Sequence, residues 1–266
     1  MLNTLRTKQV IWLIATLSLL AGGLMWRHRK SHLHEVVLPV EPGFLTPSGK
    51  HNSYTTSFAE REQPLFEGGK WISGRTTGLD WADIRTSIGL AYGTESGKGQ
   101  GDEAYDDSTA LLTGNWGADQ TVEAEVRSIH PSDDDFEEVE LRLRSFLSGH
   151  SGTGYEVLFR CSKTANAYAS IARWDGQLGK FTYLSQMKGQ EYGVADGDIV
   201  KATAVGNVIT GYINGVEVIQ ATDSTYAHGS PGMGFWFKRS SSKRFWVSKS
   251  PGPNTDCGFR RFAAWD

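Results

Sequence analysis

Two glutamates and two arginines alternate with apolar residues along one short segment. Residues 138–144 read EVELRLR, so Glu138, Glu140, Arg142 and Arg144 occupy every second position. This period of two is typical of a β-strand, and it predicts that the four charged side chains share one face. A strand rise of about 3.3 Å per residue puts Glu138 roughly 7 Å from Glu140, a spacing that suits paired carboxylates in acid–base catalysis. If the chain is an enzyme, Glu138, Glu140 and Arg142 are the predicted catalytic residues.

The same segment carries an argument against catalysis. Arg142 and Arg144 on that face are expected to lower the pKa of both glutamates, which would keep them ionised and hinder a general acid. A solvated face, or one bridged to the next strand by salt bridges, explains the pattern equally well. A serine-hydrolase elbow is not supported, because the run GHSGTG at 149–154 lies between two predicted strands rather than between a strand and a helix.

Aromatic residues near predicted turns are candidates for ligand binding. Trp174 and Asp175 end a predicted strand beside the turn DGQLG, where sandwich domains place binding loops. Sugar rings stack on aromatic faces while polar groups at the edges take their hydroxyls. The predicted ligand-binding residues are therefore Trp174, Asp175, Tyr155, Arg142, Arg144 and His150, with Tyr168, Tyr183, Trp236 and Arg160 as further candidates.

Three consecutive aspartates are the only suggestion of a metal. Asp133, Asp134 and Asp135 lie in a predicted loop, and carboxylate oxygens are ligands that Ca²⁺ prefers. Their spacing is not diagnostic, and solvated loop acids are the favoured interpretation. The sequence predicts no other cofactor.

The elements that must position these residues are predicted to be strands. Alternation recurs from Thr121 onward, in segments separated by short turns. The turn Asn214-Gly215 is the strongest hairpin signal, since both residues tolerate positive φ. The predicted strands cover residues 121–127, 138–145, 155–161, 167–174, 180–184, 198–205, 208–213, 216–221, 232–237 and 259–265. This pattern predicts an all-β fold, a two-sheet antiparallel β-sandwich, and no sustained helical periodicity follows residue 26.

Several segments resemble a known superfamily. GNVITGYINGV at 206–216, GSPGMGF at 229–235 and the closing GFRRFAAWD are similar to laminin-G-like modules of the concanavalin A-like lectin/glucanase superfamily. The resemblance implies a jelly roll over residues 55–266, with its first and last strands adjacent. Its members include lectins, adhesion modules, hydrolases and lyases, so the fold alone does not give a function.

Catalytic motifs of that superfamily are incomplete here. Its hydrolases carry E-x-D-x-E on one strand, which this chain lacks. Of the R-x-E-L-R, Q-x-H and Y-x-K-x-G motifs of alginate lyases, only Glu140-Leu141-Arg142 matches. We therefore predict a non-catalytic carbohydrate-binding or adhesion module whose partner is a glycan or a surface protein. The alternatives are a polysaccharide-cleaving enzyme acting on the concave face around Glu138, Glu140 and Arg142, and a structural protein-interaction domain.

The N-terminus is predicted to direct the domain to or past a membrane. Residues 10–26 are uncharged and mostly apolar, which suits a signal peptide or a transmembrane anchor within residues 1–30. Arg27, Arg29 and Lys30 follow it, and basic residues on that flank disfavour its export. Residues 31–54 contain three prolines and are predicted to be a linker. The expected location is extracytoplasmic, anchored or secreted, and the net charge of -3 does not suggest nucleic acid binding.

The chain has two cysteines, Cys161 and Cys257. One disulfide between them is compatible with an oxidising compartment, and two separate buried thiols are the alternative. The sequence leaves this choice open.

Overall fold

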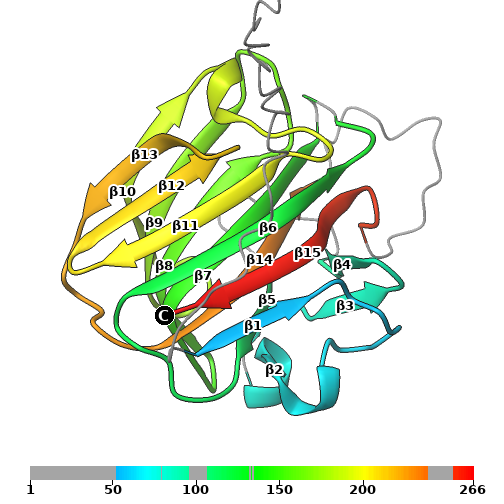
Figure 1. The fold of residues 1–266 in the computed structure, drawn as a ribbon, viewed down its shortest axis with the longest axis vertical. Helices are drawn as coiled ribbons and strands as arrows, with labels where there is room; N and C mark the ends of the chain where they lie inside the picture. The colour runs from blue at the N-terminus through cyan, green and yellow to red at the C-terminus, as the bar shows by residue number, and fades with distance from the viewer. Residues whose placement is uncertain (1–51, 79, 96–106, 132, 134, 239–253) are drawn as a thin grey trace, which may run out of the picture. The chain divides into compact units, whose positions relative to one another are not determined.

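The described residues form two stacked antiparallel sheets (Figure 1). The computed structural model describes residues 52–78, 80–95, 107–131, 133, 135–238 and 254–266. The predicted all-β sandwich is confirmed. The predicted N-terminal segment and most of the predicted linker lie outside the described residues. None of the helices in the described ranges is long and apolar enough to span a membrane.

One sheet has seven strands in the order β10-β9-β8-β7-β14-β5-β2. Their bounds are β2 Trp71–Ser73, β5 Ser108–Leu112, β7 Phe136–Ser148, β8 Ser151–Arg160, β9 Tyr168–Gly176, β10 Phe181–Lys188 and β14 Ser230–Lys238.

The other sheet has eight strands in the order β13-β12-β11-β6-β15-β4-β3, with β1 paired to β15. Their bounds are β1 Ser53–Thr56, β3 Ile84–Ser87, β4 Leu90–Gly93, β6 Gln120–Ser128, β11 Ile199–Val205, β12 Val208–Ile213, β13 Val216–Thr222 and β15 Cys257–Trp265. Short 3-10 helices cover Glu67–Gly69, Gly74–Thr77 and Gln190–Tyr192.

The core lies between the two sheets and follows the alternation of the sequence. On β7 and β8, Leu141, Val157 and Phe159 are fully buried and point toward the eight-stranded sheet, where Val122 and Phe262 meet them in one cluster. Side chains at the intervening positions of β7 and β8 consequently point to the outer face of the seven-stranded sheet. That outer face carries the polar residues described below.

A β-bulge interrupts the pairing of β7 with β8 between Leu143 and Phe146. Arg144 lies inside it with φ 48°, in the left-handed region. Gly154 faces the bulge on β8, and a Cβ at this glycine would lie 2.5 Å from the Cα of Ser145. The bulge therefore needs a glycine opposite it, and it ends the regular alternation before Arg144.

The first and last strands of the sandwich are neighbours, as the superfamily resemblance implied. β1 pairs with β15 in the register Ser53↔Trp265. The sandwich thus includes Ser53 and Tyr54, two residues before the predicted domain boundary.

The two cysteines lie together in the core between the sheets. Cys161 follows β8, Cys257 begins β15, and their Sγ atoms are 2.8 Å apart. Both are free and buried, and burial, together with the neighbouring Cys161 thiol, raises the pKa of Cys257. The structure therefore brings two thiols into contact across the sandwich.

Candidate functional site

A pocket of about 200 Å³ opens on the outer face of the seven-stranded sheet. Its polar lining consists of four carboxyl side chains, Asp107, Glu138, Glu140 and Glu156. Six aromatic side chains form most of the rest, namely Phe136, Tyr168, Trp174, Phe181, Tyr183 and Trp236. An acidic floor with aromatic walls is suited to a ligand that has both hydrogen-bonding groups and apolar faces.

Strand alternation and register assemble the floor. Glu138 and Glu140 are alternate residues of β7, and Asp107 directly precedes β5. On β8, Glu156 lies opposite Arg142, and Arg160 lies opposite Glu138. Neighbouring strands therefore bring acidic and basic side chains together on one face of the sheet.

A glycine on β14 makes room for the charged side chains. Gly234 pairs with Glu140, and a Cβ at this position would lie 2.2 Å from Oε2 of Glu140 and 3.0 Å from Nη2 of Arg142. Any larger residue would push both side chains out of place. The close approach explains why the strand has a glycine here.

Arg142 lies behind the pocket, and its guanidinium group contacts three of the acidic side chains. Its Nη2 lies 2.6 Å from Oε2 of Glu140 and 3.7 Å from Oδ2 of Asp107, while its Nη1 lies 2.7 Å from Oε2 of Glu156. The guanidinium group also lies 5.1 Å from the ring centre of Trp81 and 5.6 Å from that of Trp174, within cation–π range. Arg142 is 3% exposed, so these contacts replace its hydration.

Burial controls the ionisation of the acids. It raises the pKa of Glu140 and of Asp107 well above the ordinary values, and the charge of Glu156 adds to the effect while Arg142 opposes it. Burial likewise raises the pKa of Glu138 from 4.5 to about 8, although a hydrogen bond from the Tyr168 hydroxyl opposes the shift. Glu138 therefore holds a proton at neutral pH.

The predicted effect of the arginines on the two glutamates was wrong. The sequence predicted lowered pKa values because it placed Arg142 and Arg144 beside both residues on an open face. The face is buried instead, and desolvation of a fully buried carboxyl group outweighs the attraction of one guanidinium group.

The walls of the pocket are two groups of packed aromatic rings. On one side the centroid of Phe181 lies 4.9 Å from that of Trp174 and 4.9 Å from that of Tyr183. On the other side the ring centroids of Phe136 and Trp236 are 5.7 Å apart. Tyr183 is 45% exposed and forms part of the mouth, whereas Trp174 is 3% exposed and donates from Nε1 to Oε2 of Glu156 at 2.5 Å. Trp174 is thus a buried wall and not an exposed platform.

Of the six predicted ligand-binding residues, Trp174 lines the pocket, Arg142 lies behind it, and the other four lie elsewhere. The bulge turns Arg144 toward the backbone oxygens of Ala118 and Tyr226. His150 is exposed on the β7–β8 turn, where its Nδ1 lies 2.7 Å from Asp80. Tyr155 and Asp175 are odd-numbered residues of β8 and β9, so they point to the opposite face from Trp174. The prediction chose aromatic residues near turns and charged residues of one strand, and the sheet places these residues on different faces.

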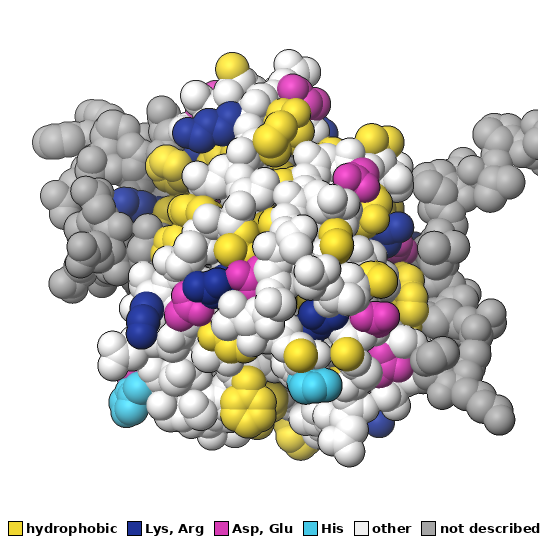
Figure 2. All heavy atoms as spheres, turned by 90° about the vertical axis from the view of Figure 1, so that its left-hand side faces the viewer, with side chains coloured by type: hydrophobic (Ala, Val, Ile, Leu, Met, Phe, Trp, Pro, Cys, Tyr) yellow, Lys and Arg dark blue, Asp and Glu magenta, His cyan; other side chains and the backbone are white. Residues whose placement is uncertain are grey.

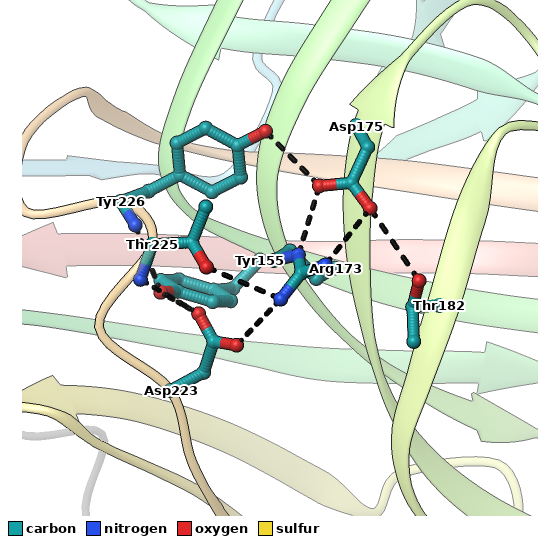
Figure 3. A network of polar contacts seen from close by, with 7 residues as sticks. All are labelled: Tyr155, Arg173, Asp175, Thr182, Asp223, Thr225 and Tyr226. Atoms are coloured by element: carbon teal, nitrogen blue, oxygen red, sulfur yellow. Dashed lines mark hydrogen bonds and ion pairs between the residues drawn. The ribbon is translucent and has the colours of Figure 1, made fainter.

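Tyr155 and Asp175 belong to a polar network at the end of the sandwich (Figure 3). Arg173 joins it, with its guanidinium group 2.8 Å from Asp175 and 2.7 Å from Asp223. Tyr155 donates to Asp223 and accepts from the backbone N–H of Tyr226. Partial burial alone would raise the pKa of Asp223, but hydrogen bonds from Tyr155, Thr225 and Arg173 lower it to about 2. The network connects β8 and β9 to the segment after β13, which is a structural role.

The loop of the candidate calcium residues makes hydrogen bonds within the protein. Asp133 Oδ1 accepts hydrogen bonds from the hydroxyls of Ser162 and Thr164, each at 2.8 Å, and these bonds lower its pKa. The backbone oxygens of Asp133 and Asp135 both accept from Arg160 at 3.1 Å. Asp134 lies outside the described residues. Asp133 and Asp135 therefore hold Arg160 in place through their backbone oxygens.

A different set of acids has the geometry of a cation site. One oxygen from each of Asp107, Glu140 and Glu156 lies within 4.8 Å of the others. Such a donor set could hold a hard cation. Arg142 already makes close ion pairs with Glu140 and Glu156, so a metal ion would have to compete with its guanidinium group.

Sequence reasoning missed four of the acidic and aromatic residues of the pocket, and also the apolar residues Leu158 and Ala172. Glu156 could have been found by pairing the two strands across the loop at 149–154, which sets it opposite Arg142. Phe136, Phe181 and Asp107 stand at or just before the starts of strands, where alternation is too short to assign a face. Tyr168, Tyr183 and Trp236 were candidates and do line the pocket.

The stacked antiparallel sheets, with first and last strands paired, define a concanavalin A-like jelly roll. A GlcNAcα1-4Gal-releasing endo-β-galactosidase from Clostridium perfringens has a similar fold, with a TM-score of 0.51 and 11% identity over 85% of this chain and 65% of that chain. The carbohydrate-binding module CBM66 from Bacillus subtilis gives a TM-score of 0.45 and 17% identity over 64% of this chain and 92% of that chain. A Bacillus licheniformis β-glucanase gives 0.45 and 11% over 82% of this chain and 96% of that chain.

No protein-family model and no curated protein matches the sequence. The sandwich fold that the sequence predicted is confirmed. The laminin-G-like subtype stays a prediction.

Proposed function

We propose that the domain binds a saccharide in the pocket on the outer face of the seven-stranded sheet. The observation that carries the proposal is the combination, in one pocket, of an acidic floor with aromatic walls. Apolar faces of a sugar ring pack on aromatic side chains, and sugar hydroxyls donate to carboxylate oxygens. The similar structures include an endo-β-galactosidase and a carbohydrate-binding module, which is consistent with this proposal.

The size of the pocket limits what it can enclose. Pockets for drug-sized ligands measure about 300–1,000 Å³, and this one is smaller at about 200 Å³. It suits a single sugar ring, with the rest of a longer glycan lying outside.

A binding assay with paired tyrosine variants tests the proposal. Calorimetry and a glycan array should detect a saccharide ligand for the wild-type protein. Tyr183→Ala, at the mouth of the pocket, should weaken binding by about 5- to 30-fold, since losing one stacking ring costs on the order of 1–2 kcal/mol. Tyr212→Ala is the matched control, because Tyr212 lies on β12 in the other sheet. A blank array, or equal loss in both variants, would contradict the proposal.

Hydrolysis of the bound glycan is a second candidate, and one observation favours it. Glu138 keeps its proton at neutral pH while Glu140 and Glu156 pair with Arg142, so the pocket offers a general acid beside carboxylates with a cationic partner. Release of reducing ends from a polysaccharide panel would support this function. Glu138→Gln and Glu140→Gln should each abolish this release. If the wild-type protein cleaves no polysaccharide of the panel, hydrolysis is refuted and saccharide binding stands as the proposed function.

We also propose that the domain is displayed outside the cytoplasmic membrane, anchored or secreted. The apolar segment at residues 10–26 supports this location. Protease treatment of intact cells should degrade the domain, and full protection in intact but not in lysed cells would contradict this.

A protein partner is less well supported on the side of the molecule seen in Figure 2. Hydrophobic side chains lie there in small separate groups, and acidic and basic side chains are interspersed among them. This side therefore shows no broad apolar patch of the kind that marks many protein–protein interfaces.

A further inference from the structure

The ionisable side chains that line the pocket are all acidic, as far as the described residues go. Asp107, Glu138, Glu140 and Glu156 face the cavity. The nearby cations, Arg142 and Arg160, are 3% exposed and engaged from behind, Arg142 by carboxylates and Arg160 by backbone oxygens. Four carboxyl groups thus lie beside two guanidinium groups that are already engaged. Glu138 holds its proton and the pKa values of Asp107 and Glu140 are raised, so a positively charged group placed beside these acids would favour their ionised form, whereas a negatively charged group would oppose it.

One carboxylate oxygen in the pocket lacks a hydrogen-bond donor. Oδ1 of Asp107 is buried and has no partner among the described residues, although Oδ2 faces Arg142 at 3.7 Å. Asp107 is 3% exposed and lines the cavity. A buried acceptor without a donor costs free energy, so a donor supplied by a ligand would gain more here than at the surface.

The aromatic walls favour an organic cation over a bare metal ion. Trp174, Phe181, Tyr183 and Trp236 present ring surface to the cavity, and such rings attract ammonium groups. A metal ion would gain nothing from the walls, and at the floor it would compete with Arg142 for Glu140 and Glu156. A protonated primary amine on a sugar ring uses both features, because its three N–H groups reach the acids while the ring packs on the aromatics.

We propose that the pocket selects a saccharide whose enclosed ring carries a free, protonated amino group, in preference to neutral, N-acetylated and acidic sugars. This inference rests on the proposed saccharide binding and names the chemical class of its ligand. It makes the acidic floor, and above all Asp107, the element that determines specificity.

A ligand series that differs only in charge tests the inference. Calorimetry on the wild-type protein would compare three oligosaccharides of the same β-1,4 linkage and length, made of glucosamine, N-acetylglucosamine or glucose. Free galactosamine, mannosamine and glucuronic acid would extend the series. We expect an amino sugar to bind at least ten-fold more tightly than its N-acetylated and hydroxyl counterparts, and glucuronic acid to bind most weakly.

The outcomes separate this inference from the proposed function. If neutral or acidic sugars bind as tightly as amino sugars, the selectivity is refuted while saccharide binding stands. If no saccharide binds, both are refuted. The comparison uses the wild-type protein, so it does not depend on whether any variant folds.

A pair of isosteric variants locates the selectivity. Asp107→Asn should reduce the preference for the amino sugar over its hydroxyl counterpart at least five-fold. Asp119→Asn is the control, because Asp119 lies outside the pocket and accepts from the backbone N–H of Gly206. An unchanged preference in folded Asp107→Asn would overturn the role given to Asp107.

Discussion

Replacing the buried acid Glu138 with its neutral isostere should stabilise the protein. In the folded state the pKa of Glu138 is about 8, whereas its ordinary value is 4.5. A carboxyl group with a raised folded pKa binds more protons in the native state than in the unfolded state between these two values. Stability from this group is therefore fully present below the unfolded pKa and is lost as the pH rises toward the folded pKa.

The expected size follows from the same two pKa values. Each pH unit between about 4.5 and 8 costs roughly 1.4 kcal/mol, so at pH 7 ionisable Glu138 lowers the free energy of unfolding by about 3 kcal/mol. Glu138→Gln removes this cost and keeps an oxygen that accepts from Tyr168. The ionisable groups close to Glu138 in both proteins are Asp107, Glu140, Glu156 and Arg160.

Urea unfolding of both proteins at pH 5 and pH 7 measures the effect. The advantage of Glu138→Gln should grow by about 2–3 kcal/mol between the two pH values, and its sign at pH 7 should be stabilising. Glu217→Gln, on the exposed side of β13, should stay within about 0.5 kcal/mol of the wild type at both pH values. An advantage that is constant with pH, or a loss of stability at pH 7, would refute the claim that Glu138 is protonated in a desolvated pocket.

Three further predictions concern the supports of the pocket and the core. Arg142→Met should lower the free energy of unfolding by about 3–5 kcal/mol in urea at neutral pH, because it leaves Glu140 and Glu156 without their cation. The control Arg261→Met, at an exposed position of β15, should change this free energy by less than about 1 kcal/mol, and equal effects of the two variants would contradict the buried ion pairs. Asp223→Asn should destabilise the protein above pH 4. The difference in the free energy of unfolding between variant and wild type should fade as the pH drops toward 2, because the lowered pKa of Asp223 gives stability that is lost through that range. A difference that is the same at pH 3 and pH 6 would exclude a stabilising role for the ionised Asp223. Mild oxidation should join Cys161 to Cys257 in a disulfide and lower the intact mass by about 2 Da. The disulfide should raise the free energy of unfolding by about 4–5 kcal/mol on the chain-entropy model, and Cys161→Ser should show neither change. An unchanged mass after oxidation would show that the two thiols do not come into contact in solution.

Much of the fold could be predicted because strands with one buried face alternate strictly. The segments from residue 120 onward are long enough for that pattern, and their turns carry glycine or asparagine where positive φ is needed, as at Asn214 and Gly215. The strands before residue 113 have three to five residues each. Their pattern is too short to separate from loops, so the first third of the sandwich was not predicted.

The site was harder to predict than the fold. Alternation correctly put Glu138, Glu140 and Arg142 on one face, but it could not show whether that face was open or covered. The bulge that diverts Arg144 depends on a close backbone approach at Gly154, which no local pattern reveals. Partners from distant segments, such as Asp107, are brought in by strand order, and strand order is a property of the whole chain.

The pairing of β1 with β15 has a consequence for engineering. Asn52 donates its backbone N–H to Asp266 at 2.9 Å, so the two ends of the sandwich touch. A short peptide could join them, and the chain could be reopened at the tight turn of Gly206 and Asn207 without cutting a strand. Such a circular permutant would move both termini to the tip of the β11–β12 hairpin, in the sheet opposite the pocket, and it would let a reporter be fused there without crowding the ligand.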